Sequence, residues 1–232
     1  MTLLEAVYTR RSRRSFLKTS LPDKHRQELL RQIALLNLEY DLHIQLIENA
    51  APVFAGFRAS YGMFQNVEHF IALIGRRSDP LLRRKLGYCG ERLVLEATRM
   101  ELGTCWVGGT FDRSRCPCQL KADEQLCLVI AIGQVSPMEG RRESLIHNLT
   151  ARKTKPLEAL YTSDVEPPEW FLDGIRAVQR APSAMNRQPV QFRLKEGRIT
   201  VGVQAISPFA EIDLGIALLH FELGANRKIN LM

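Results

Sequence analysis

The sequence predicts an α+β fold made of two related parts, a first half at residues 1–165 and a shorter second half at 166–232. Apolar residues recur at helical spacing in four longer segments, at 21–36, 79–103, 169–180 and 213–225. Short apolar or alternating runs between these helices predict strands. Both halves have the order helix, strand, strand, helix, and one helix in each half ends in Glu-Leu-Gly. This shared order favours an internal duplication, with the glycine of each triplet capping its helix in the left-handed conformation.

The elements of the first half follow from local patterns. Residues 2–9 carry a short apolar helical face, and the next helix begins with a proline and an aspartate, which is a common helix start. Strands are expected at 42–48, where polar and apolar residues alternate, and at 69–75, an apolar run that ends at a glycine. Residues 125–133 are the most apolar of these runs, so they are expected at the centre of a sheet.

The second half follows a polar connector at residues 134–156. Its first helix, at 169–180, leads through a loop at 181–189 to two short strands. A Lys-Glu-Gly-Arg turn joins these strands, which are expected at 190–194 and 199–203. The helix at 213–225 follows them.

Composition and charge limit the classes of function. The chain has 232 residues, 45% of them hydrophobic, which is enough to bury a full core. A formal net charge of +7 favours anionic partners such as nucleotides, phosphates or nucleic acid. However, 25 acidic residues are spread among the 32 basic ones, and most aromatic residues lie in apolar runs. A dedicated nucleic-acid-binding stripe is therefore not favoured.

The cysteines and the apolar runs indicate a cytoplasmic protein outside the membrane. Five cysteines are present, and none shows the paired spacing of a zinc site, because Cys-Pro-Cys at 116–118 has no second pair within reach. Reduced intracellular thiols are the simplest interpretation. The N-terminal stretch has no apolar core of signal-peptide length, and no apolar run along the chain approaches the length of a membrane span.

The sequence contains no recognisable catalytic nucleophile or metal motif. It has no G-x-G-x-x-G after a strand, no G-x-x-x-x-G-K-[ST] loop, no His-Glu-x-x-His and no serine nucleophile elbow. The five histidines are scattered along the chain. If the protein is an enzyme, a cofactor must therefore supply the difficult chemistry.

A basic stretch, Thr-Arg-Arg-Ser-Arg-Arg-Ser-Phe at residues 9–16, is the first candidate binding site. Alternate residues of an extended segment share one side, so Arg10, Ser12 and Arg14 would converge while the arginines between them point away. Two guanidinium groups with a hydroxyl between them suit a phosphate monoester. A solvated basic face and a kinase target are the alternatives at this point.

A second candidate is Ala-Pro-Ser-Ala-Met-Asn-Arg-Gln-Pro at residues 181–189, between a helix and a strand. This order predicts a tight turn with backbone donors and side-chain amides. Amides offer both a donor and an acceptor, which matches the mixed edge of a heterocycle. A turn with capping residues is the alternative interpretation, although the segment is longer than a turn requires.

Together with Leu-Gly-Thr-Cys-Trp-Val-Gly-Gly-Thr-Phe at 102–111, these stretches resemble the nitroreductase family of flavin enzymes. The resemblance implies a three-layer α/β/α sandwich in which Arg10, Ser12 and Arg14 hold the phosphate of FMN. A basic residue of the connector, Arg152 or a neighbouring lysine, is a further candidate for the phosphate. The other implied FMN contacts are Val107, Gly108, Gly109, Pro182, Ser183, Ala184, Asn186 and Gln188.

The sequence departs from the usual family in how these motifs are distributed. In the usual family one subunit carries both the arginine opening and, one helix later, the segment similar to 181–189, which serves the opposite subunit of a dimer. Here the first half has only the opening and the second half has only the later segment. A fused, degenerate duplication explains this pattern. It resembles the single-chain branch of the family, which implies a monomeric pseudo-dimer with one FMN per chain.

The activity implied by the resemblance is that of an NAD(P)H-dependent oxidoreductase. Hydride would pass from NADH or NADPH to FMN and then to a small-molecule acceptor such as a nitroaromatic or a quinone. The family needs no side-chain acid or base for this step, so no catalytic residue is assigned. Two alternatives are an FMN-binding carrier or sensor with little turnover and a basic nucleic-acid-binding module.

Overall fold

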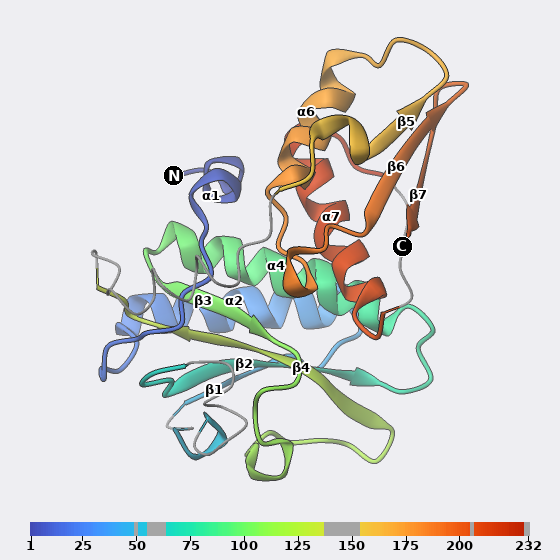
Figure 1. Cartoon of the computed structure of the whole chain (residues 1–232). Coiled ribbons are helices and arrows are strands. Elements are labelled where there is room, and N and C mark those ends of the chain that lie inside the picture. Colours follow the sequence, from blue (N-terminus) through green and yellow to red (C-terminus); the bar gives the residue numbers. More distant parts are fainter. Residues whose placement is uncertain (49–50, 55–63, 137–153, 205–206, 230–232) are drawn as a thin grey trace. The chain divides into compact units, whose positions relative to one another are not determined.

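The computed structural model describes residues 1–48, 51–54, 64–136, 154–204 and 207–229 (Figure 1). They belong to two compact units. Unit 1 comprises Met1–Thr9, Arg83–Arg92 and Thr150–Met232, and unit 2 comprises Arg10–Leu82 and Leu93–Leu149. Helix α4 (Leu82–Arg99) runs through parts of both units.

Unit 2 is built on a four-stranded antiparallel sheet with the strand order β1-β2-β4-β3. Strand β4 (Glu124–Gly133) pairs with β2 on one side and β3 on the other, so the prediction that this apolar run lies centrally is confirmed. The outer strand β1 is shorter than the sequence suggested. The remaining strands have these bounds: β1 Gln45–Ile47, β2 His69–Arg76 and β3 Gly103–Val107.

Unit 2 buries apolar residues of helix α2 (Asp23–Tyr40) and of its sheet. The buried residues of α2 are Leu29, Ile33 and Leu36, and the helix runs further than the predicted 21–36. Two 3-10 turns complete the described part of this unit, η1 (Ala51–Phe54) and η2 (Arg113–Arg115). A core cluster joins the sheet to these turns through Phe16, Phe54, Phe70, Phe111 and Val129.

Unit 1 combines helices with a three-stranded sheet of order β5-β6-β7. Strands β5 and β6 are parallel, whereas β6 and β7 form an antiparallel hairpin. The predicted turn of this hairpin is confirmed, since Glu196 and Gly197 have φ values of 49° and 74°, as a tight hairpin turn requires. The elements are α1 Leu3–Thr9, η3 Leu157–Ala159, β5 Tyr161–Ser163, α6 Glu169–Gln179, η4 Ala184–Asn186, β6 Val190–Lys195, β7 Arg198–Val203 and α7 Ala210–Ala225.

Helices α6 and α7 pack closely because small residues lie at their crossing. A Cβ atom on Gly174 would meet the ring of Phe221 at 2.6 Å, and one on Gly224 would collide with the backbone carbonyl of Asp173. Phe221 also stacks on Phe192 of β6, with ring centroids 4.6 Å apart. This packing ties the hairpin to the helix pair and fixes the scaffold from which the loop at 181–189 emerges.

The glycine caps expected from the two Glu-Leu-Gly triplets are wrong. After α4 the left-handed residue is Glu101, with φ of 60°, and Gly103 already belongs to β3. Gly224 lies inside α7, whose left-handed cap is Asn226 with φ of 49°. Both glycines instead allow close approach, because a Cβ atom on Gly103 would collide with Val135.

The α+β character predicted from the sequence is confirmed, whereas the internal duplication stays a prediction. The described sheet of unit 2 is wholly antiparallel and that of unit 1 contains a parallel pair. Within the part of the chain that the structure describes, no helix is both long and apolar enough to cross a bilayer.

Candidate functional site

The basic stretch at 9–16 becomes an extended segment held by backbone hydrogen bonds in unit 2. Arg13 N–H donates to the carbonyl of Thr104 in β3 at 2.8 Å, and Ser12 forms a parallel bridge with Thr104. On the other side, Gln65 N–H donates to the carbonyl of Arg14 at 2.8 Å. Buried Phe16 anchors the end of the segment in the core. Because the backbone is fixed on both sides, the side chains leave it in defined directions.

Three of these side chains act on one thiol, that of Cys105 on β3. Arg14 and Ser12 hydrogen-bond to the sulfur of Cys105, and the charge of Arg10 also acts on it. The guanidinium of Arg13 turns elsewhere and donates to the carbonyl of Ser136 at 3.1 Å. The structure therefore brings Ser12 and Arg14 to one thiol, and Arg10 acts on that thiol through its charge. We name Arg10, Ser12, Arg14 and Cys105 the arginine–serine cradle.

The thiol at the base of the cradle is held in its neutral form. Burial raises the pKa of Cys105, although the charges of Arg14 and Arg10 and the hydrogen bonds from Arg14 and Ser12 act in the opposite direction. The thiol itself lies 3.6 Å from the carbonyl of Trp106, to which it donates. Since the sulfur carries no charge, it does not neutralise the two arginines.

The Val-Gly-Gly stretch begins where β3 ends. Val107 is the last residue of the strand and is buried, whereas Gly108 is half-buried and Gly109 is exposed. A Cβ atom on Gly109 would meet nothing within 4 Å. The folded chain therefore does not need a glycine here for space, and this backbone faces a region that a ligand can approach.

The loop at 181–189 in unit 1 has an unusual backbone. Met185, Asn186 and Gln188 have φ values of 55°, 50° and 46°, in the left-handed region that non-glycine residues seldom adopt. The hydroxyl of Ser183 accepts the N–H of Gln188 at 2.9 Å, and the carbonyl of Ser183 accepts the N–H of Asn186 at 2.9 Å. Met185 is 64% exposed at the tip of the turn.

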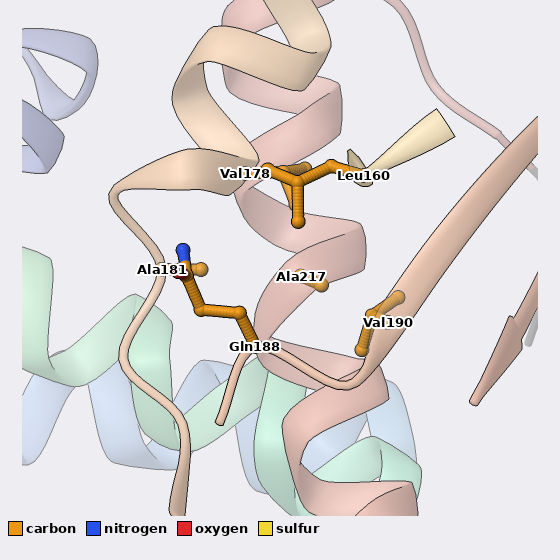
Figure 2. Close-up of a pocket in the computed structure, with 6 residues that line it drawn as sticks. All are labelled: Leu160, Val178, Ala181, Gln188, Val190 and Ala217. Carbon is orange, nitrogen blue, oxygen red and sulfur yellow. The ribbon is translucent and has the colours of Figure 1, made fainter. Parts of the chain in front are cut away.

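The side chain of Gln188 is buried inside unit 1 and hydrogen-bonded there. Its side-chain carbonyl accepts the N–H of Lys155 at 2.7 Å, and its amide nitrogen donates to the carbonyl of Gln179 at 3.0 Å. The ammonium of Lys155 donates to the backbone carbonyl of Gln188 at 2.9 Å. Figure 2 shows the amide end of Gln188 beside Ala181. These bonds fix the shape of the loop and occupy the amide that the sequence suggested as a direct ligand contact.

The cavity beside Gln188 is too small for a cofactor. It is lined by Leu160, Val178, Ala181, Gln188, Val190 and Ala217 and has a volume of about 10 Å³ (Figure 2). That is room for about one water molecule. A larger hollow of about 580 Å³ lies over strands β5–β7, and its lining contains none of the predicted site residues.

Asp213 on α7 anchors the loop from the other side. Its carboxylate accepts the N–H of Ala184, with oxygen distances of 3.1 and 3.4 Å. Only 5% of Asp213 is exposed. Burial raises the pKa of Asp213 to about 6, although the hydrogen bond from Ala184 lowers it. The loop is therefore tied to a buried carboxyl group that titrates near neutral pH.

The predicted site residues fall into two sets. Arg10, Ser12, Arg14, Val107, Gly108 and Gly109 belong to unit 2, and Pro182, Ser183, Ala184, Asn186 and Gln188 belong to unit 1. Arg152 lies outside the described residues.

Sequence reasoning missed two residues that support these sets, Cys105 and Asp213. Cys105 stands inside the quoted stretch at 102–111, and alternation along β3 gives no sign that its thiol meets the arginines. Asp213 begins the apolar helical pattern of α7, where an acidic residue is ordinarily interpreted as favouring the helix start. Its burial against Ala184 depends on tertiary packing, which the local pattern does not encode.

The family and the fold follow from comparison with known proteins. Residues 2–225 match the model of a protein family described as "Putative TM nitroreductase". A protein of Thermotoga maritima described as "a putative nitroreductase" superposes with a TM-score of 0.65 at 20% identity, covering 98% of this chain and 87% of that chain. At this identity the likeness establishes the fold alone. No curated protein matches the chain.

Two further solved structures match only part of the chain. A Bacteroides fragilis nitroreductase with bound FMN has a TM-score of 0.45 at 13% identity, covering 59% of this chain and 89% of that one. A Desulfovibrio desulfuricans protein, "a putative nitroreductase" in complex with FMN, has a TM-score of 0.47 at 17% identity, covering 63% of this chain and 96% of that one. TM-scores below 0.5 do not by themselves establish a shared fold.

Proposed function

Because the chain belongs to the nitroreductase family, we propose that it is an FMN-dependent oxidoreductase that moves hydride from NADH or NADPH to a small-molecule acceptor. When bound, FMN supplies the hydride chemistry, and the chain needs no nucleophile of its own. The observation that supports the proposal is that Ser12 and Arg14 bond the Cys105 thiol and that the charge of Arg10 acts on the same group.

The cradle fits the phosphate of FMN in charge and in donor type. Two guanidinium groups and one hydroxyl provide charge-assisted and neutral hydrogen bonds for three phosphate oxygens. The neutral thiol at their base leaves both positive charges available to a dianion. Arg10 and Arg14 are half-buried, which suits a small anion better than an extended nucleic-acid backbone.

The glycine-rich stretch at 107–109 and the amide-rich loop at 181–189 are proposed to contact the isoalloxazine ring. Gly108 and Gly109 would let the ring lie against the backbone, since no side chain stands there. The left-handed conformations at Met185, Asn186 and Gln188 support a ligand-binding role, because residues in such conformations cost about 1–3 kcal/mol each and cluster at functional sites. Lys155, Gln188 and Asp213 would hold this loop in shape rather than contact the flavin.

Paired titrations with FMN and riboflavin test the phosphate assignment. Riboflavin has the same ring without the phosphate, so damage to the cradle should weaken FMN binding only. Each hydrogen bond to a charged group contributes about 1.5–3 kcal/mol. The double variant Arg10→Ala/Arg14→Ala should therefore bind FMN at least about 100-fold more weakly, with unchanged riboflavin affinity.

A matched control removes an arginine from the same segment. Arg11 is exposed and lies between the two cradle arginines, so Arg11→Ala should leave both affinities within about twofold. Equal losses of affinity for FMN and riboflavin in the double variant would show that the cradle does not bind the phosphate. Absence of flavin binding in the unaltered protein would reject the proposed function itself.

A further inference from the structure

The Cys-Pro-Cys motif lies in unit 2, immediately after η2, and the proposed flavin chemistry does not use it. Cys116 and Cys118 are both half-buried and reduced, and both pack against the core cluster that includes Phe111. The other three cysteines of the chain are buried. Two accessible thiols therefore stand two residues apart on one short loop.

The two side chains leave the loop on the same side. Cys116 has an extended backbone, with φ of −72° and ψ of 115°, and both side chains pack against the same core cluster. Pro117 fixes its own φ angle, so the segment between the two cysteines is stiff. The thiolate is the form of cysteine that ligates metals.

The loop that carries the thiols is held at both ends. The guanidinium of Arg113 donates to the carbonyls of Leu126 and Cys127 on β4, at 2.6 and 2.7 Å. On the far side, the amide of Gln45 in β1 bonds both backbone groups of Gln119, at 3.0 and 2.6 Å. The sheet thus orders the pair before any ligand arrives, which lowers the entropic cost of binding.

We propose that Cys116 and Cys118 form a bidentate dithiolate site for a soft, low-coordinate thiophilic centre of the class of trivalent arsenic or monovalent copper. In the residues that the structure describes, no three His, Cys, Asp or Glu side chains gather as a metal site. Two sulfurs alone do not complete the tetrahedral shell that zinc takes in structural sites. They do suit centres that soft thiolates select and that accept few protein ligands.

Phenylarsine oxide is a direct probe of this chemistry. Its arsenic forms one bond to each sulfur, and its oxygen leaves as water with the two thiol protons, so arsenic stays trivalent and nothing is oxidised. The reduced, desalted, full-length protein should gain one arsenical per chain, less one water, by intact mass. The adduct should survive a monothiol such as glutathione and be removed by a dithiol.

Single substitutions separate a chelate from scattered thiol reactivity. Cys116→Ser and Cys118→Ser should each bind phenylarsine oxide at least about 100-fold more weakly, because the second bond of a chelate is intramolecular. The matched control Cys127→Ala removes a buried cysteine and should keep full binding. Binding that survives both serine variants, or that is lost in the control, would overturn the proposal.

A zinc titration tests the coordination class. Zn²⁺ should protect the two thiols from a colorimetric thiol reagent at least about 100-fold less effectively than phenylarsine oxide, since two sulfurs leave zinc with half of its usual ligands. Equal protection by zinc would contradict the low-coordinate assignment. The site involves none of the proposed flavin contacts, so these results are independent of whether the protein binds FMN.

Discussion

Replacing Asp213 by asparagine should stabilise the protein at neutral pH, because the aspartate is a buried carboxyl group with a raised pKa. Burial raises the pKa of Asp213 to about 6, from an ordinary value of 3.8. The folded state therefore holds this proton more tightly than the unfolded state does. The stabilisation that the protonated group provides is complete below the ordinary pKa and is lost as pH rises through the folded pKa. A shift of about two pKa units corresponds to about 3 kcal/mol in total.

Asparagine keeps an oxygen for the Ala184 N–H and removes the proton that titrates. The free energy of unfolding of Asp213→Asn, minus that of the unaltered protein, should rise by about 2 kcal/mol from about pH 4.5 to about pH 7.5. For a chain of this size that is a change of about 4–8 °C in the difference between the melting temperatures. Urea or thermal unfolding followed by circular dichroism at the two pH values measures it. A stability difference that is independent of pH would refute the burial argument.

Three further predictions concern the cradle and the glycines. Cys105→Ala should weaken FMN binding by about 2–10-fold without changing riboflavin binding, because the acceptor that orients Arg14 and Ser12 is lost, at about 0.5–1.5 kcal/mol for a hydrogen bond. Cys105→Ser should restore FMN affinity, and equal losses for both flavins would show a merely structural role. Gly224→Ala should destabilise the fold by about 1–3 kcal/mol, since its Cβ collides with the carbonyl of Asp173. Gly109→Ala should change stability by no more than about 0.5 kcal/mol, because its Cβ meets nothing within 4 Å. The same substitution should weaken flavin binding. A destabilising Gly109→Ala that keeps flavin affinity, or a Gly224→Ala without loss of stability, would contradict the role assigned to that glycine.

The sequence was sufficient to predict most elements of the fold because their patterns are local. The apolar run at β4 predicts a buried strand. Alternation and the turn residues Glu196 and Gly197 predict the hairpin. The glycine caps after α4 and α7 failed for a tertiary reason. Gly103 and Gly224 are needed where a strand or helix packs closely against a neighbour. Such tertiary contacts cannot be predicted from the local sequence pattern.

The candidate site was predictable in part for a similar reason. Alternation in an extended segment predicted that Arg10, Ser12 and Arg14 share one side, and in the fold Ser12 and Arg14 both bond the Cys105 thiol. It could not identify Cys105, because that thiol reaches the arginines only through the pairing of Ser12 with Thr104. The FMN contact of Gln188 stays a prediction; the local sequence pattern does not indicate that its amide bonds Lys155 and Gln179 in the fold.

The most direct test of the account is a visible absorbance spectrum of the purified protein, reconstituted with FMN and recorded before and after anaerobic addition of NADPH, then of NADH. The account predicts a protein-bound flavin spectrum that bleaches with at least one nicotinamide donor, and recovers when a quinone or nitroaromatic acceptor is added. Bound flavin that neither donor bleaches would contradict the oxidoreductase and leave a carrier or sensor. A protein that retains no FMN would contradict the cradle on which the proposal rests.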